Sequence, residues 1–281
     1  MKKDVLVFLF LLGFTTLIFG QTGSGFVAVE NAGKITITGY NGTAKNVIIP
    51  DEVNGMPIVA IGDNTFYKKD LTSVTINKNV TLIGNNAFSG NQLTSVIIPD
   101  SVTIIGDHAF SSNRLTNVVI GKNVTSIGYG AFENNQLTSI VIPNSVIKIG
   151  KTSFSRNKLT NVTFPNNIKV IEDNTFIGNQ LKSITIPNGV TTIKGYVFAD
   201  NPIENIIIPN SVKEIGEFAF YNCPLTSITI GANVEFSYYT FYSYDNNIGF
   251  SSSYYNNGRT AGTYTRVDTK ATTWVKGAFS F

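Results

Sequence analysis

The sequence is poor in the side chains that most often perform chemistry or bind metals. Its 281 residues include one histidine, one cysteine, one tryptophan and two methionines. One histidine cannot build a metal site, and one cysteine cannot form an internal disulfide bond. We therefore expect no catalytic residues, no metal site and no cofactor, and we predict that the protein is not an enzyme.

Charge is also scarce. Asp, Glu, Lys and Arg make up 14% of the residues, against roughly 25% in an ordinary soluble protein. The 21 cationic residues are scattered among 18 anionic ones, with a net charge of +3. This pattern lacks the basic stripe that nucleic acids require, so no nucleic-acid partner is expected. The hydrophobic content of 42% is enough for a sizeable core and excludes a disordered chain.

The first residues have the layout of a secretory signal peptide. A short charged start is followed by a nearly continuous apolar run of 16 residues, Val5 to Gly20, and then by small polar residues. The run is shorter than the ~20 residues that cross a bilayer. We expect residues 1–20 to be a signal peptide cleaved near Gly20. The protein would then be secreted, periplasmic or at the cell surface, without a membrane span after removal of the signal.

Beyond this segment, apolar residues recur every 22 positions. The first column holds Phe66, Phe88, Phe110, Phe132, Phe154, Phe176, Phe198 and Phe220. The second holds Ile61, Ile83, Ile105, Ile127, Ile149, Ile171, Ile193 and Ile215. The third holds Leu71, Leu93, Leu115, Leu137, Leu159, Leu181, Ile203 and Leu225. A fixed period of this length is typical of solenoids, in which each coil buries its apolar residues against its neighbours.

A short β-branched run follows each residue of the third column, as in Val96-Ile97-Ile98, and ends at Pro, Gly or Asn. Such runs read as strands. With Val47-Ile48-Ile49 they predict about nine coils, mostly strand and irregular coil. One face is expected to be a parallel β-sheet, and irregular turns containing the Ile and Phe columns are expected on the other. The spacing leaves no room for long helices.

A further column lies three residues after each Phe and is mostly asparagine. Its first member is Lys69, and the others are Asn91, Asn113, Asn135, Asn157, Asn179, Asn201 and, at the last position, Cys223. Because a short amide at a tight turn can bond the backbone of its own and the adjacent coil, we predict a structural asparagine ladder. Cys223 is then expected to be a buried structural thiol.

The motif Leu-x-x-Val-x-Ile-Pro-x-x-Val-x-x-Ile-Gly-x-x-Ala-Phe-x-x-Asn is almost intact from Leu93 to Asn113. It resembles the leucine-rich repeat of the BspA-type bacterial surface proteins, and the resemblance covers residues 46–241. It implies an exported solenoid that mediates adhesion or protein–protein interaction, with host matrix or a neighbouring cell surface as candidate partners. It implies no catalytic residue and no fixed ligand motif.

Both ends of the repeat are predicted to be caps, because an open stack exposes strand edges and an apolar cross-section. Residues 21–45 contain a hairpin signal around Asn31-Ala32-Gly33. Residues 242–281 are rich in Tyr, Ser and Asn and contain a second hairpin signal around Asp268-Thr269-Lys270. Two interpretations of this second segment stay open, a cap and a binding patch, since tyrosine is favoured at binding hot spots.

Function is expected on exposed surfaces. Alternation along the strands turns one column of β-branched residues toward solvent: Thr75, Ile97, Val119, Val141, Thr163, Thr185, Ile207 and Thr229. With Tyr254, Tyr255, Tyr264 and Trp274 of the C-terminal segment, these are the candidate protein-binding residues. The leading hypothesis is a non-catalytic binding or adhesion protein. The alternative is a structural protein that self-associates in the cell envelope, and a third, weaker hypothesis is ordered-water or crystalline-surface binding by a threonine column. The oligomeric state is left open.

Overall fold

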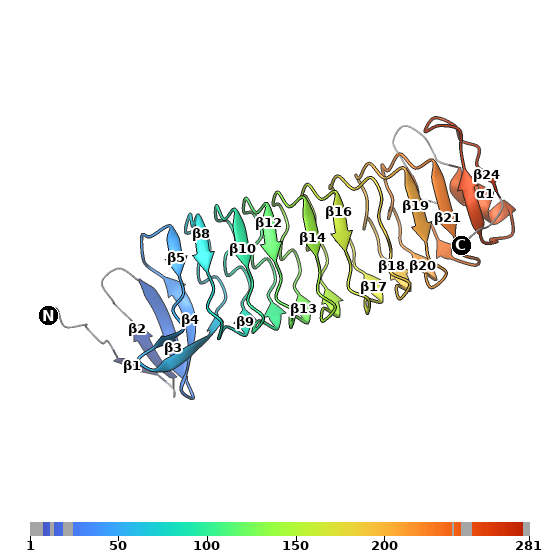
Figure 1. Ribbon diagram of the computed structural model, residues 1–281. Coiled ribbons are helices and arrows are strands. Elements are labelled where there is room, and N and C mark those ends of the chain that lie inside the picture. The colour runs from blue at the N-terminus through green and yellow to red at the C-terminus, as the bar shows by residue number, and fades with distance from the viewer. Residues whose placement is uncertain (1–7, 12–13, 19–24, 238, 243–248, 278–281) are drawn as a thin grey trace. The chain divides into compact units, whose positions relative to one another are not determined.

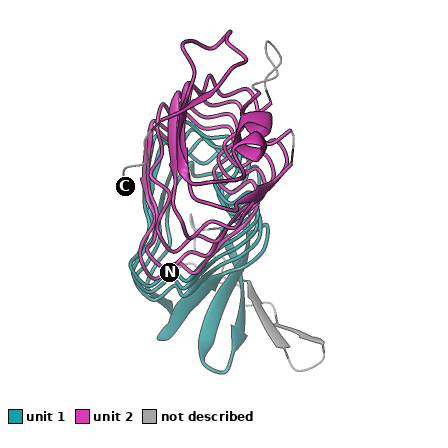
Figure 2. Cartoon of the chain, turned by 90° about the vertical axis from the view of Figure 1, so that its right-hand side faces the viewer, with its two compact units in different colours: residues 1–136 teal, residues 137–281 magenta. Residues whose placement is uncertain are grey.

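The computed structural model describes residues 8–11, 14–18, 25–237, 239–242 and 249–277, with side chains from residue 25 onward. The chain divides into two compact units, residues 1–136 and 137–281 (Figure 2). Both units are built from the same coil, so the fold is the leucine-rich-repeat solenoid that the period predicts. Gly20, the expected cleavage position, lies outside the described residues, and cleavage there stays a prediction.

One coil of the first unit shows how the sequence sets the local structure. The front strand β10 (Ser95–Ile97) buries Val96 and ends before Pro99, which lacks a backbone donor. A turn leads to the two-residue back strand β11 (Ile104–Ile105). A second turn places Phe110 in the core and returns the chain to the front. Each coil thus contributes two short strands and two turns (Figure 1).

In the first unit the front strands pair in parallel, β5 with β8 and β10 with β12, and the back strands pair β9 with β11 and β11 with β13. The register joins residues 22 apart in the pairs Val96↔Val118 and Ile105↔Ile127. The remaining front strands are β5 (Asn46–Ile48), β8 (Ser73–Thr75) and β12 (Asn117–Val119), and the other back strands are β9 (Leu82–Ile83) and β13 (Ser126–Ile127).

The N-terminal cap is an antiparallel hairpin of β3 (Phe26–Asn31) and β4 (Lys34–Tyr40), as the sequence predicts. Ala32 and Gly33 both have positive φ, the geometry of a two-residue hairpin turn. The cap joins the coils because β4 pairs in parallel with β7 (Met56–Ile61), which also pairs with β6 (Glu52–Val53) and β9. Within the expected signal peptide, β1 (Phe8–Leu11) pairs with β2 (Phe14–Ile18), and β2 pairs with β3.

The second unit repeats the coil. Its front strands are β14 (Ser139–Val141), β16 (Asn161–Thr163), β19 (Asn205–Ile208) and β21 (Ser227–Ile230). Its back strands are β15 (Lys148–Ile149), β17 (Val170–Ile171), β18 (Thr192–Ile193), β20 (Glu214–Ile215) and β22 (Glu235–Phe236). Residues 184–186 lie at a front position but form only an isolated bridge, Thr185 with Ile207.

The back of each coil differs from the expectation of irregular turns. From Ile83 onward the Ile column lies in two-residue strands, and within each unit these strands form a parallel ladder of their own, for example β17–β18–β20–β22. The physical reason is the exact repeat length, which brings the same backbone groups of successive coils into register. Buried N–H and C=O groups there need partners, and the next coil supplies them.

The core of each unit contains a column of stacked phenylalanine rings. In the first unit, ring centroids from Phe66 through Phe88 and Phe110 to Phe132 are 5.0, 5.2 and 5.5 Å apart. In the second unit, the spacings from Phe154 to Phe241 lie between 5.3 and 5.9 Å. All these rings are at most 1% exposed.

The C-terminal cap combines a short helix with a hairpin. Helix α1 (Phe250–Asn256) places Phe250 against Phe241, with ring centroids 4.7 Å apart. Strand β23 (Gly262–Thr265) pairs antiparallel with β21, and β24 (Val275–Lys276) pairs with β23. These contacts confirm a hairpin-like cap at this end, although the sequence analysis missed the helix.

Candidate binding surfaces

The front strands expose alternate residues as the sequence predicts. In the first unit, Ile97 and Val119 are 68% and 49% exposed, and Thr75 is also exposed. Ile48, one coil earlier than Thr75, is 73% exposed. The sequence analysis left Ile48 out of its candidates, although its strand belongs to the same series. These residues form an uncharged, largely β-branched column.

The same column continues within the second unit and ends at the cap. Val141 and Ile207 are 65% and 61% exposed, and Thr163 and Thr185 are exposed as well. Thr229 differs, because β23 pairs with its strand and its hydroxyl lies 2.9 Å from that of Thr263. Only 9% of Thr229 is exposed, so the structure removes it from the accessible surface.

A groove of about 880 Å³ lies on this face of the second unit. It is lined by exposed front residues such as Thr185 and Ile207 and by turn residues such as Asn188, Asn210 and Ser211. The Ser211 hydroxyl is buried and has no hydrogen-bond partner among the described residues. The sequence analysis missed the turn residues, because alternation along a strand says nothing about the turn beside it.

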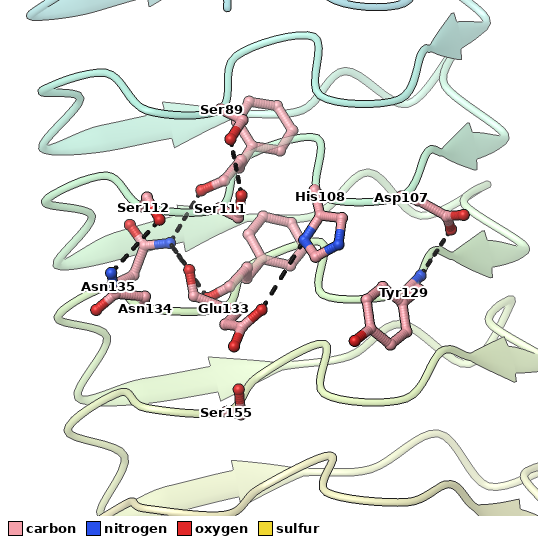
Figure 3. A network of polar contacts seen from close by, with 12 residues as sticks. Ser89, Asp107, His108, Ser111, Ser112, Tyr129, Glu133, Asn134, Asn135 and Ser155 are labelled. Carbon is pink, nitrogen blue, oxygen red and sulfur yellow. Dashed lines mark hydrogen bonds and ion pairs between the residues drawn. The ribbon is translucent and has the colours of Figure 1, made fainter. Parts of the chain in front are cut away.

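The asparagine column forms the internal ladder that the sequence predicts. The side-chain amide of Asn135 donates to the carbonyl oxygens of Phe110 and Phe132, at 3.0 and 3.2 Å (Figure 3). Its Oδ1 accepts from the backbone N–H of Leu115 at 3.0 Å. One side chain thus satisfies groups of two neighbouring coils. The Oδ1 atoms of the other asparagines also accept backbone N–H groups: Asn91, Asn113, Asn157, Asn179 and Asn201.

Cys223 occupies the last position of this column in the second unit. Its side chain is 1% exposed, and its thiol donates to the carbonyl oxygen of Phe198 at 3.2 Å. Burial raises the pKa of the Cys223 thiol to about 12. A thiol that stays protonated is a poor nucleophile, so the geometry gives this residue a packing role.

The tyrosine-rich segment places most of its candidate rings inside the cap. Tyr254 and Tyr264 are fully buried and Trp274 is 4% exposed, whereas Tyr255 is 41% exposed. The Tyr254 hydroxyl donates to the carbonyl oxygen of Gly231 at 2.7 Å. Loss of water contact raises the pKa of both Tyr254 and Tyr264. Rings buried in this way cannot form the exposed patch of the binding interpretation, and of these four candidates only Tyr255 is left on the surface.

Arg266 organises the same cap and was not foreseen. Its Nε donates to the carbonyl oxygen of Leu225 at 2.6 Å, and its Nη1 donates to the carbonyl oxygens of Thr269 and Ala271. The guanidinium lies 5.2 Å from the ring centroid of Trp274, and burial lowers the pKa of Arg266. Nothing in the repeat pattern marks this residue, since it lies beyond the last coil.

The threonine column of the third hypothesis consists of Thr72, Thr94, Thr116, Thr138, Thr160 and Thr226. Thr72, Thr116, Thr160 and Thr226 donate their hydroxyls to backbone carbonyl oxygens of the preceding coil. Each of these four hydroxyls has used its one donor and keeps only acceptor capacity for water, so the four offer ordered water no array of donors.

Histidine, cysteine and acidic side chains are the groups that could support catalysis or hold a metal ion. His108 lies on the coil surface, 3.9 Å from a carboxylate oxygen of Glu133 and edge-on to the ring of Tyr129 (Figure 3). No group of three or more His, Cys, Asp or Glu side chains among the described residues could hold a metal ion. In that same part of the chain, no helix has the length and apolar character of a membrane span.

The family follows from the repeat itself. The model of the BspA type leucine-rich repeat region matches six copies, over residues 59–181 and 170–261. The chain belongs to the BspA-type leucine-rich repeat family. No curated protein matches it.

Solved structures agree with this BspA-type fold. A leucine-rich repeat protein from Bacteroides ovatus is 24% identical with a TM-score of 0.61, over 80% of this chain and 67% of that protein. A leucine-rich repeat protein of T. pallidum is 24% identical with a TM-score of 0.52, over 72% of this chain and 88% of the other. At these identities the likeness concerns the fold alone.

Proposed function

We propose that this BspA-type protein is an exported, non-catalytic binding protein that recognises another protein through the groove on the front face of its second unit. The observation that supports this most directly is exposed, apolar Ile207 in a groove that is also lined by the exposed polar side chains of Thr185, Asn188 and Asn210. Family membership and the expected signal peptide support a place at the cell surface or outside the cell.

The groove suits an extended protein segment. Backbone groups of β19 and β21 are already paired with each other, so a partner must be held by side chains. Ile207 offers apolar area, which contributes about 25 cal/mol for each Å² removed from water. Thr185, Asn188 and Asn210 are exposed and offer hydroxyl and amide groups to the partner's backbone.

The groove contains no charged residue. Recognition by charge is therefore weak, and binding should change little with salt concentration. An apolar centre within a polar rim is typical of protein interfaces. This favours a protein partner over an anionic polymer.

The test compares two isoleucine-to-lysine variants of the full chain. Ile207→Lys places a charge in the groove, whereas Ile147→Lys places one at a residue 68% exposed that does not line the groove. Binding is measured to intact cells and to a panel of purified matrix proteins. We expect Ile207→Lys to weaken binding at least about tenfold, the effect of losing one central contact, and Ile147→Lys to leave it unchanged.

Equal behaviour of the two variants would contradict the groove, and failure to bind any panel member would contradict the matrix and cell partners. Sedimentation velocity of the same samples separates the self-association alternative, which predicts oligomers that Ile207→Lys dissolves. Deleting residues 242–281 would be a poor test of binding. Phe250 and Tyr254 pack against Phe236 and Phe241, so the deletion would also uncover rings of the core.

A further inference from the structure

Five aromatic side chains gather on the surface of the last coils of the second unit, away from the residues that line the groove. Tyr196, Phe218 and Tyr239 form one stack, with successive ring centroids 4.9 and 5.5 Å apart. Tyr221 and Tyr242 lie beside it, their ring planes turned by 84° from Phe218 and by 71° from Tyr239. We name these five residues the aromatic cluster.

The aromatic cluster is open to solvent. Tyr196 and Tyr239 are 38% and 48% exposed, and the other three rings are half-buried. In the preceding coils of the unit, the positions equivalent to the stack hold Thr152 and Asn174. The cluster is therefore an addition to the last coils and not a feature of the repeat.

Two of its residues are held in a strained backbone. Tyr196 and Phe218 have φ of 55° and 56°, in the left-handed region. The equivalent positions of the other coils are also at positive φ, and they hold Asn64, Asn86, His108, Gly130, Thr152 and Asn174. Asparagine and glycine tolerate this conformation, whereas bulky side chains do so only under strain. The left-handed backbone is thus a feature of the repeat, and at this position Tyr196 and Phe218 carry bulkier side chains than the other coils do.

Two acidic residues are linked to the aromatic cluster through the backbone, and the Asp200 carboxylate accepts a hydrogen bond from the side-chain amide of Asn222 at 2.8 Å. Glu217 directly precedes Phe218, and its backbone carbonyl accepts the N–H of Tyr196 at 3.0 Å. Asp200 donates its own backbone N–H to the carbonyl of Tyr221 at 2.8 Å. Both side chains are exposed, and neither has an ion-pair partner among the described residues. Lys194 is close in sequence, but its positive charge instead helps to lower the pKa of Asp173.

We propose that the aromatic cluster is a second binding site, for a proline-rich protein segment that carries basic residues. Such a segment forms a polyproline II helix, whose carbonyl oxygens have no internal partners. Aromatic surfaces recognise it at low entropic cost, and tyrosine hydroxyls can donate to those carbonyls. Asp200 and Glu217 would meet the basic residues.

The probe is a fluorescent oligoproline peptide with an arginine at each end, and the control peptide replaces its prolines with glycine and serine. Fluorescence anisotropy with the full chain measures affinity. We expect saturable binding of the proline peptide alone. The paired substitution Tyr196→Asn with Phe218→Asn should weaken it at least about tenfold. The Tm should not fall, because asparagine suits the left-handed backbone.

Two further variants sharpen the test. Replacing both carboxylates, Asp200→Asn with Glu217→Gln, should weaken binding about threefold and reduce its salt dependence. Tyr196→Phe with Tyr239→Phe removes only the hydroxyl groups and keeps the stacked rings. We expect this variant to bind the proline peptide more weakly, and the result is informative even if the asparagine variant fails to fold. Ile207→Lys, in the groove, should have no effect.

No binding of the proline peptide, equal binding of both peptides, or unchanged affinity of the asparagine variant would overturn the proposal. A Tm that falls in that variant while affinity is kept would assign the cluster a structural role. Binding of a soluble glucan in place of the peptide would also overturn it, since that ligand has neither prolines nor a positive charge.

Discussion

The Cys223 thiol donates to the carbonyl oxygen of Phe198 at 3.2 Å, in the place where Asn201 donates to the carbonyl of Phe176 at 2.9 Å in the coil before. The two side chains thus donate to equivalent carbonyls, but they differ in the number of hydrogen bonds that they make. Asn201 also donates to the carbonyls of Phe198 and Ala199, and its Oδ1 accepts the N–H of Leu181. A thiol has one weak donor and one weak acceptor. The ladder of the second unit therefore ends on its weakest member.

The first prediction is that Cys223→Asn stabilises the protein. The new amide can donate to two carbonyls as Asn201 does, and each net hydrogen bond is worth about 1 kcal/mol. We expect the free energy of unfolding in urea to rise by about 1 kcal/mol. Cys223→Ala is the control and should lower it, because alanine removes the thiol's hydrogen bond to the Phe198 carbonyl, which then keeps only the Asn201 amide as a donor. A Cys223→Asn protein no more stable than Cys223→Ala would show that this position does not act as part of the ladder.

The second prediction concerns pH. An unfolded chain loses its cysteine proton near pH 8.5, whereas burial holds the pKa of Cys223 at about 12 in the folded protein. Above about pH 9 the unfolded state binds fewer protons, so stability falls as pH rises toward 12, by at most about 1.4 kcal/mol per pH unit. Urea unfolding measured at increasing pH should show this slope.

Cys223→Ala should lack that part of the slope, because the tyrosines common to both proteins cancel in the comparison. The native thiol should also resist a disulfide reagent at pH 8 and react once urea unfolds the chain. Rapid labelling of the folded protein would contradict the burial on which both results depend.

The coils could be predicted because each apolar column repeats a local choice. Alternation around Val96 turns Ile97 outward, and the amide column places Asn135 between two coils, as the structure shows. A period of 22 residues leaves the register no freedom. One unit of the pattern therefore constrains every other, and the sequence alone predicts the fold, the ladder and the exposed column.

The rest depends on contacts that occur once. Thr229 looks like every other member of its column, but β23 covers it, and β23 lies more than thirty residues later. The burial of Tyr264 and Trp274 likewise results from packing of α1 against the last coil. The back ladder was missed for another reason, since strands of two residues are too short for any alternation to mark them.

The third prediction tests the ladder in the first unit. Asn135→Ala leaves the carbonyls of Phe110 and Phe132 and the N–H of Leu115 without this partner. The Phe110 carbonyl keeps the amide of Asn113 as a donor, but the buried Leu115 N–H loses its partner, so we expect a loss of about 1 to 3 kcal/mol in unfolding free energy. Asn117→Ala, on the exposed front of β12, is the matched control and should change stability by less than about 0.5 kcal/mol. Similar losses in the two variants would argue against an internal ladder.

The fourth prediction separates cap from binding patch in the tyrosine-rich segment. The Tyr254 hydroxyl donates to Gly231 and accepts the N–H of Val234 at 3.1 Å, both in the last coil. Tyr254→Phe keeps the ring but leaves these two buried backbone groups without their hydrogen-bond partner. We therefore expect the free energy of unfolding in urea to fall by about 1 to 3 kcal/mol. The Tyr255 hydroxyl also donates to the coil, to Phe236 at 2.9 Å, but its side chain is 41% exposed.

Water can replace the lost hydroxyl in Tyr255→Phe, so that variant should lose less than about 1 kcal/mol. The order of the two losses is the decisive quantity, because a segment that folds only on a ligand would lose nothing in either variant. If Tyr254→Phe were as stable as the native chain, α1 would not be held on the coil by this hydroxyl. The apolar contact of Phe250 with Phe241 would then have to close the solenoid alone.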